Sequence, residues 1–143
     1  MPTANDPFDL QRFVDAQAPV YDRVRAELRN GRKQSHWMWF IFPQIAGLGR
    51  SAMAQRYAIS SLDEAKAYLA HPVLGPGWRE CARLVVQVDG KSAYDILGSP
   101  DDMKFHSCMT LFGRAAPQEQ VFIDALEKYF GGAEDQATVA RLR

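Results

Sequence analysis

Apolar residues recur at helical spacing along nearly the whole chain, so most segments are predicted to be helices that bury one face. The spacing predicts longer helices over residues 10–17, 20–28, 62–70, 78–88, 99–112 and 121–129. Shorter helical segments are expected over residues 51–57, 92–97 and 135–142. No convincing hairpin, internal repeat or low-complexity tract interrupts this pattern. We therefore expect one all-α domain over residues 1–143, a compact bundle of about seven to eight short helices.

Several helix starts carry capping signals. Ser61 and Glu64 have the spacing of a capping box, and Ser51 is a candidate cap for the segment that reaches Tyr57. Ser99 precedes a proline and two aspartates, which predicts a capping serine, a proline in the first turn and carboxylates near the positive end of the helix dipole. These signals sharpen the predicted boundaries.

The most unusual segment is the aromatic block from Trp37 to Phe42, which directly follows a basic and polar turn. The block is too short for its periodicity to distinguish a helix from a strand. Trp37, Phe40 and Ile41 would share a helical face, whereas Trp37, Trp39 and Ile41 would share a strand face. We favour a short buried helix that ends at Pro43.

Composition and charge narrow the class of protein. The chain is 47% hydrophobic and 24% charged, as in an ordinary soluble globular domain, and its formal net charge is zero. General nucleic-acid binding is therefore not expected, because neutralising phosphates requires a basic surplus. Basic residues do gather between Arg23 and Lys33, so a local anion site is possible.

The cysteines and the N-terminus bear on the compartment. Cys81 and Cys108 each lie in a helical pattern among apolar neighbours, so we expect buried free thiols and a reducing compartment. Residues 1–10 have no apolar signal-peptide core, and no apolar run is long enough to span a membrane. We expect a cytoplasmic protein without a membrane partner; the sequence leaves the oligomeric state open.

Metal and nucleotide motifs are missing from the sequence. His36, His71 and His106 have no partner at ligand spacing, and the glycines at 47 and 49 lack the rest of a dinucleotide fingerprint. We expect no metal or other cofactor. Cys108 could pair with His106 or His36 as a nucleophile, but a cysteine on an apolar helical stripe is far more often part of the core.

Two groups of residues are candidates for binding a ligand. The first surrounds the aromatic block: Arg32, Lys33, Ser35 and His36 before it, and Gln44 after it. The basic groups could hold a phosphate or carboxylate while Trp37 or Trp39 stacks on a ring. The alternative is a solvated basic segment beside a core anchor. We expect at least one of the two indoles to border a pocket that contains Arg32, Lys33 or His36.

The second group is the polar strip Lys104, Ser107 and Thr110, whose members are three positions apart on one predicted helix. The strip could line a cleft, or its hydroxyls could bond to the preceding turn. If both groups serve one site, the strip should face the same cavity as the turn from Arg32 to His36.

These candidates support two hypotheses. The first is a protein that binds a small phosphorylated or nucleotide-like ligand and, if it is an enzyme, hydrolyses it, with Asp101 or Asp102 as the first candidates for an acid or base. The alternative is a non-catalytic interaction module that uses an aromatic patch or a groove for a partner helix.

Several motifs together resemble a known family. They are Asp6–Phe13, Gly31-Arg32-Lys33, His36–Gln44, Gly47-Leu48-Gly49, Tyr57, and Lys104 with Ser107 and Met109–Phe112. This combination resembles the uncharacterised bacterial family known as domain of unknown function 1810, which has a mycobacterial member of known, mainly helical fold. The resemblance implies an all-α fold and no particular activity. The run of helices and the fragment His71-Pro72-Val73-Leu74 also resemble the helical N-glycosidases that act on ADP-ribose-type and riboflavin-pathway compounds.

Overall fold

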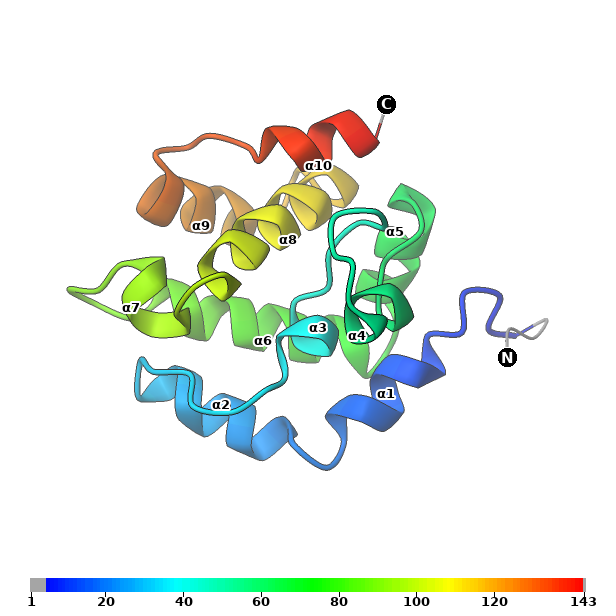
Figure 1. The fold of residues 1–143 in the computed structure, drawn as a ribbon, viewed down its shortest axis with the longest axis horizontal. Helices are drawn as coiled ribbons and strands as arrows, with labels where there is room; N and C mark the ends of the chain where they lie inside the picture. The colour runs from blue at the N-terminus through cyan, green and yellow to red at the C-terminus, as the bar shows by residue number, and fades with distance from the viewer. Residues whose placement is uncertain (1–4, 143) are drawn as a thin grey trace.

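The computed structural model describes residues 5–142, and within them the chain forms ten helices (Figure 1). Their bounds are α1 Gln11–Gln17, α2 Tyr21–Arg29, α3 Met38–Ile41, α4 Ala52–Arg56, α5 Leu62–Ala70, α6 Leu74–Val86, α7 Ala93–Leu97, α8 Asp101–Ala115, α9 Gln120–Phe130 and α10 Gln136–Arg141. The all-α prediction is confirmed. Within the described residues the count is ten rather than about seven to eight, and three of the ten have only four or five residues.

Helix α8 forms the centre of the bundle, and it packs against α5, α7, α9 and α10 (Figure 1). Helix α6 lies behind it and connects α2, α5 and α9, so the first and last thirds of the chain meet through α6 and α8. The short helix α3 packs against α1. The longest helix, α8, has 15 residues; in the described part of the chain, no helix combines the length and apolar character that crossing a bilayer requires.

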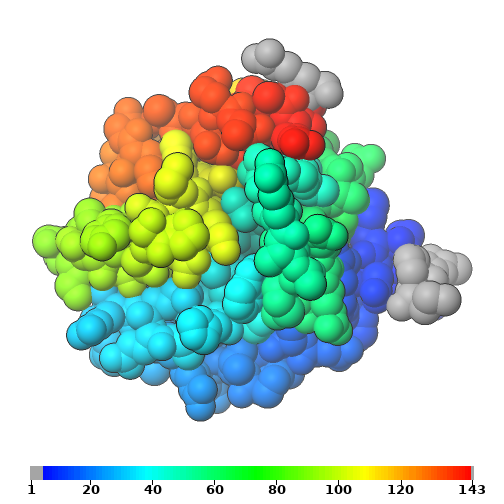
Figure 2. All heavy atoms as spheres, viewed as in Figure 1, coloured from blue at the N-terminus to red at the C-terminus, as the bar shows by residue number. Residues whose placement is uncertain are grey.

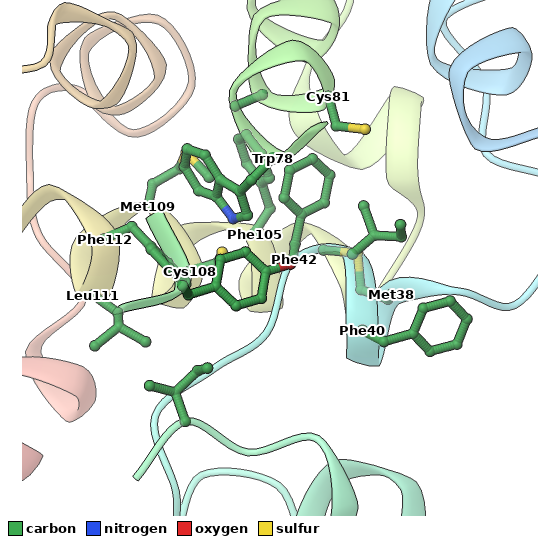
Figure 3. Close-up of a cluster of buried hydrophobic side chains, with 14 of the residues drawn as sticks. Met38, Phe40, Phe42, Trp78, Cys81, Phe105, Cys108, Met109, Leu111 and Phe112 are labelled. Carbon is green, nitrogen blue, oxygen red and sulfur yellow. The ribbon is translucent and has the colours of Figure 1, made fainter. Parts of the chain in front are cut away.

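The core is built from aromatic rings that α3, α6 and α8 bring together (Figure 3). Phe42 meets Phe105 edge-on with ring centroids 5.0 Å apart and Trp78 at 6.2 Å, while Trp78 packs against Phe112 at 4.9 Å. Such offset and perpendicular contacts are the favoured arrangements of aromatic pairs. The segment after α3 is therefore part of the core rather than a surface loop.

The aromatic block adopts the predicted short helix. Met38–Ile41 form α3, Phe42 is its C-cap, and the buried Pro43 comes next. Phe40, Ile41 and Phe42 are buried, and Trp37 caps the helix with only 1% of its surface exposed. Trp39 is half-buried. The helical alternative is confirmed, since Trp37 shares the buried side with Phe40 and Ile41, whereas Trp39 faces outward.

Two predicted caps differ from what the structure shows. Ser99 does not cap α8; Pro100 occupies the N-cap, and the amide of Asp102 donates instead to the carbonyl of Gly98 over 2.8 Å. Ser61 does cap α5, but Glu64 does not complete the box, because its carboxylate binds Ser60 and Arg12. The Ser51 cap of α4 is confirmed. A complete capping box is found at Ser92 and Asp95 of α7.

Candidate binding pocket beside Trp39

The polar turn before the aromatic block is organised around one buried carboxylate, Glu27 of α2. Oε1 of Glu27 accepts hydrogen bonds from the amides of Gln34 (2.7 Å) and Ser35 (3.0 Å) and from the indole of Trp37 (3.0 Å). Its Oε2 accepts from the hydroxyl of Ser35 at 2.6 Å. Burial by itself raises the pKa of Glu27, but the hydrogen bonds from Ser35, Gln34 and Trp37 outweigh it and hold the pKa below its ordinary value.

This arrangement changes the interpretation of the turn. Of the polar residues proposed to bind an external anion, Ser35 already binds this internal carboxylate, and the bond from the indole fixes Trp37 with its ring inside the core. Gly31 makes the sharp exit from α2 possible, because its φ of +69° lies in the left-handed region that favours glycine. The hydrogen bonds that Ser35 and Trp37 donate to Glu27 therefore indicate that both side chains stabilise the fold.

A second link joins the turn to helix α8. Nζ of Lys33 lies 2.9 Å from Oδ2 of Asp101, and Nζ of Lys104 lies 3.8 Å from Oδ1 of the same carboxylate. Each ammonium group also lies over an indole: Lys33 is 5.2 Å from the Trp37 ring and Lys104 is 5.7 Å from the Trp39 ring. With Glu27 at the Trp37 indole, two lysines and two carboxylates surround the two tryptophans, and Lys104 is the cation of this group nearest to the Trp39 ring.

A pocket opens next to Trp39. Its volume is about 170 Å³, and α3, the loop after it, α4 and the start of α8 enclose it. Figure 2 shows these segments, cyan to green and yellow, meeting on one face of the molecule. The pocket is lined by Met38, Trp39, Phe42, Gln44, Ile45, Ala46, Gly47, Gly49, Ala54, Gln55, Tyr57, Ala58 and Lys104. Three of the residues predicted from the sequence, Trp39, Gln44 and Lys104, therefore converge here.

The loop wall of the pocket is held in place by short backbone contacts. The amide of Ala46 donates to the carbonyl of Ile59, and the amide of Ile59 donates to the carbonyl of Gln44, both over 2.8 Å. Gly49 lies against α4 so closely that an added Cβ would stand 2.5 Å from Cβ of Ala54. A side chain at position 49 would force the loop or α4 to move, and its absence keeps this wall of the pocket thin.

The pocket contains polar groups that have no partner of their own. The side-chain amide of Gln44 makes no hydrogen bond within residues 5–142, and neither does the hydroxyl of Tyr57. Lys104 supplies the cation, although Asp101 draws it toward the rim. The chemistry of the pocket thus combines one cation, the side-chain amides of Gln44 and Gln55, one phenol and the indole of Trp39.

Arg32 and His36 lie elsewhere. Arg32 is exposed and lines a shallow basic depression with Lys33, Lys91 and Tyr94, while His36 is exposed on the same turn. Trp39 does border a pocket, but that pocket contains Lys104 rather than Arg32, Lys33 or His36. The expected neighbourhood was wrong in this respect, because Glu27 turns the loop inward and directs Lys33 toward Asp101.

Ser107 and Thr110 do not line the pocket either. The hydroxyl of Ser107 donates to Oδ2 of Asp135 over 3.0 Å, and Oγ1 of Thr110 accepts from the amide of Asp135 over 2.9 Å. Thr110 also donates to the carbonyl of His106 in the preceding turn. Both hydroxyls therefore attach the start of α10 to α8. All three residues of the polar strip were expected to face one cavity, but only Lys104 lines the pocket beside Trp39.

The candidates for acid, base or nucleophile are also separate from the pocket. Asp101 is paired with two lysines, and neither Asp101 nor Asp102 lines the pocket. Cys81 and Cys108 are free and buried, as expected; burial raises the pKa of Cys81 to about 12 and that of Cys108 well above its ordinary value. Within the described residues, no group of three or more His, Cys, Asp or Glu is arranged to hold a metal ion.

Sequence reasoning missed Glu27 and the pocket position of Tyr57. A signal for Glu27 was present, because it lies on the same helical face as Val24 and Leu28, and an acid on an apolar stripe needs donors when it is buried. Tyr57 carried no such signal, since its place beside Gln44 depends on how the loop folds back onto residues 57–59.

Comparison with known proteins agrees with the fold. The crystal structure of the conserved hypothetical protein Rv1873 from Mycobacterium tuberculosis is similar, with a TM-score of 0.94 and 60% sequence identity over 96% of this chain and 98% of that chain. A search of curated proteins found no significant match. The family model described as protein of unknown function (DUF1810) matches residues 7–142. Since this match spans almost the whole sequence, the chain belongs to the DUF1810 family.

Proposed function

We propose that the protein binds a small anionic ligand with a flat ring in the pocket beside Trp39. The observation that carries the proposal is the placement of Lys104, whose Nζ lies 5.7 Å from the Trp39 ring at a cavity of about 170 Å³. The ammonium group can hold a carboxylate or phosphate while the indole contacts the ring. The free amide of Gln44 supplies both a donor and an acceptor for the polar edge of that ring.

The volume of the pocket sets the size of the ligand. Binding sites for drug-sized molecules have about 300–1,000 Å³, whereas an apolar cavity of about 150 Å³ is known to hold a benzene molecule. The pocket therefore accommodates a single ring with one anionic substituent. In a nucleotide-like ligand, only the base or another single ring would enter, and the remainder would extend past Lys104.

The proposal is limited to binding. Neither Asp101 nor Asp102 reaches the pocket, so no carboxylate is placed to act on a ligand there, and we add no hydrolytic or N-glycosidase step. The interaction-module alternative finds little support in the aromatic block. Its residues Trp37, Phe40 and Phe42 are buried, and an exposed patch for a partner cannot be built from them.

The proposal is tested by calorimetric titration at low ionic strength. The probes are benzoate, nicotinate, phenyl phosphate, adenosine monophosphate and ADP-ribose, with inorganic phosphate to separate ring from anion recognition. Lys104→Met should weaken binding of the best ring anion at least about tenfold, which corresponds to about 1.4 kcal/mol. Lys66→Met is the matched control, because Lys66 is exposed on α5 and makes no ion pair with the described residues.

A second variant tests the ring. Trp39→Leu should weaken benzoate and nicotinate binding but leave any binding of inorganic phosphate unchanged. The proposal is rejected if none of the ring anions binds, or if Lys104→Met and Lys66→Met behave alike.

A further inference from the structure

A second, more apolar depression lies on another part of the molecule, between α1, α2 and α6. Its volume is about 540 Å³, within the usual range for small-molecule sites. It is lined by Val14, Gln17, Ala18, Tyr21, Val73, Pro76, Gly77 and Glu80. None of these residues lines the pocket beside Trp39, so the two sites are independent.

Gln17 is the most informative residue of this groove. It is only 7% exposed, and its side-chain nitrogen donates to the carbonyl of Phe40 at 2.8 Å and to the hydroxyl of Tyr68 at 2.9 Å. Both N–H groups are thus directed into the core. The side-chain oxygen accepts no hydrogen bond from residues 5–142 and is the group left to face the groove. This oxygen is not sealed in the core and reaches the surface of the groove, where a ligand that donates a hydrogen bond can bind it.

The other polar groups of the groove are also acceptors. Oε1 of Glu80 accepts the hydroxyl of Tyr21 at 2.6 Å and lies 3.2 Å from Nε of Arg25. Burial and the bond to Glu80 raise the pKa of Tyr21, so its hydroxyl stays protonated and keeps donating to this carboxylate. Arg25 also pairs with Asp22, whose Oδ1 lies 3.6 Å from Nη1 of the guanidinium. Asp22 is exposed and does not line the groove, so Glu80 is the charged residue among those that line it.

The remaining lining residues form an apolar floor and rim. Val14 and Ala18 come from α1, and Val73 and Pro76 come from the start of α6. Val73 is 58% exposed, an unusual degree for a valine. Gly77 allows the Tyr21 ring to approach α6 closely, because an added Cβ would stand 3.3 Å from that ring.

From the unpaired Gln17 oxygen, the negative Glu80 end and the apolar floor, we propose that this groove binds a small apolar molecule with an ammonium group at one end. The apolar body lies on Val14, Ala18, Val73 and Pro76. The ammonium group donates to the side-chain oxygen of Gln17 and to Oε2 of Glu80, because Tyr21 and Arg25 contact only Oε1 of that carboxylate.

The test compares three probes of equal length that differ only at their polar end: 4-phenylbutylamine, 4-phenylbutyrate and 4-phenylbutanol. Amide chemical shifts measured by NMR during titration report both affinity and location. We expect the amine to bind with a Kd below about 1 mM, and at least tenfold more tightly than the carboxylate. The largest shifts should fall on α1, α2 and the start of α6.

Two variants locate the site. Ala18→Trp should fill the groove and abolish amine binding, whereas Ala26→Trp, at an exposed position of α2 outside the groove, should not. Glu80→Gln should weaken the amine about tenfold and leave the alcohol unchanged. The proposal is overturned if the amine does not bind, if all three probes bind equally, or if Ala18→Trp has no effect; absence of binding by all three would favour a protein partner for the groove.

Discussion

The indole nitrogen of Trp37 lies 3.0 Å from Oε1 of Glu27, and this hydrogen bond connects α2 with the aromatic block inside the core. The same carboxylate holds two backbone amides of the turn between them. The sequence suggests that this turn binds an external anion, but its amides bind a carboxylate of the protein itself. The pocket that we propose for an external ligand instead lies beside Trp39 and Lys104.

Replacing Glu27 with glutamine should destabilise the fold. The substitution removes the charge that four hydrogen bonds now stabilise, and an NH₂ group in place of Oε2 would require the hydroxyl of Ser35 to turn and accept. Hydrogen bonds to charged groups contribute about 1.5–3 kcal/mol each, so we expect a loss of at least about 2 kcal/mol in the free energy of unfolding. Urea denaturation at pH 7 measures it. Glu127→Gln, at an exposed position of α9, should change stability by less than about 0.5 kcal/mol.

The contribution of Glu27 should depend on pH in one direction. Its pKa in the folded protein is below the ordinary value of 4.5, so its ionised form stabilises the fold at neutral pH. This stabilisation is complete above the unfolded pKa and is lost as pH falls through the folded pKa. The difference in unfolding free energy between wild type and Glu27→Gln should therefore be constant from pH 7 to 5.5 and shrink below about pH 4.5. A difference that grows on acidification would contradict this assignment.

Much of the fold follows from local pattern, whereas the site does not. The helical spacing of residues such as Phe105, Cys108, Met109 and Phe112 depends only on neighbours along the chain, and those positions are indeed buried. The roles of Ser107 and Thr110 depend on Asp135, which comes from a different helix start. Their spacing on α8 shows only that they share a face, and not whether that face meets a ligand or another helix.

Neither cysteine should react in the native protein. Cys81 and Cys108 are at most 1% exposed, and burial raises both pKa values, so the reactive thiolate is scarce as well as inaccessible. We expect no release of chromophore from Ellman's reagent by the folded protein at pH 8, and two equivalents per chain after unfolding in guanidinium chloride. Rapid modification of either thiol in the native state would show that the core around α6 and α8 opens readily.

Replacing Arg12 with lysine should lower the stability of the fold. Its guanidinium donates to the carbonyls of Phe8, Asp9, Arg56 and Ala58 and to the carboxylate of Glu64, at distances from 2.6 to 3.0 Å. A lysine ammonium has three donors and no planar fork, so it cannot reach this set. We expect Arg12→Lys to lower the free energy of unfolding by about 2 kcal/mol or more. Arg23→Lys, at an exposed position of α2, should leave it nearly unchanged.

The thin wall of the Trp39 pocket gives a prediction that connects packing with binding. In Gly49→Ala, the new methyl group would stand 2.5 Å from Cβ of Ala54, too close for any real contact, so the loop or α4 has to move. Overpacking of this kind typically costs about 1–3 kcal/mol. Ala54→Gly removes the opposing methyl group, at about 0.5–1 kcal/mol of helix stability. In the double variant the two costs should not add, because the methyl group at position 49 then occupies the space that Ala54 has left.

Thermal unfolding of the four proteins, wild type, both single variants and the double variant, measures the coupling between the two positions. Titration of the same proteins with the best ring anion shows whether the wall shapes the pocket. We expect Gly49→Ala to lose binding and the double variant to recover part of it, since Lys104, Trp39 and Gln44 are unchanged. Costs that simply add would mean that the loop relaxes away from α4 without strain, and binding that survives in Gly49→Ala would place the ligand outside this pocket.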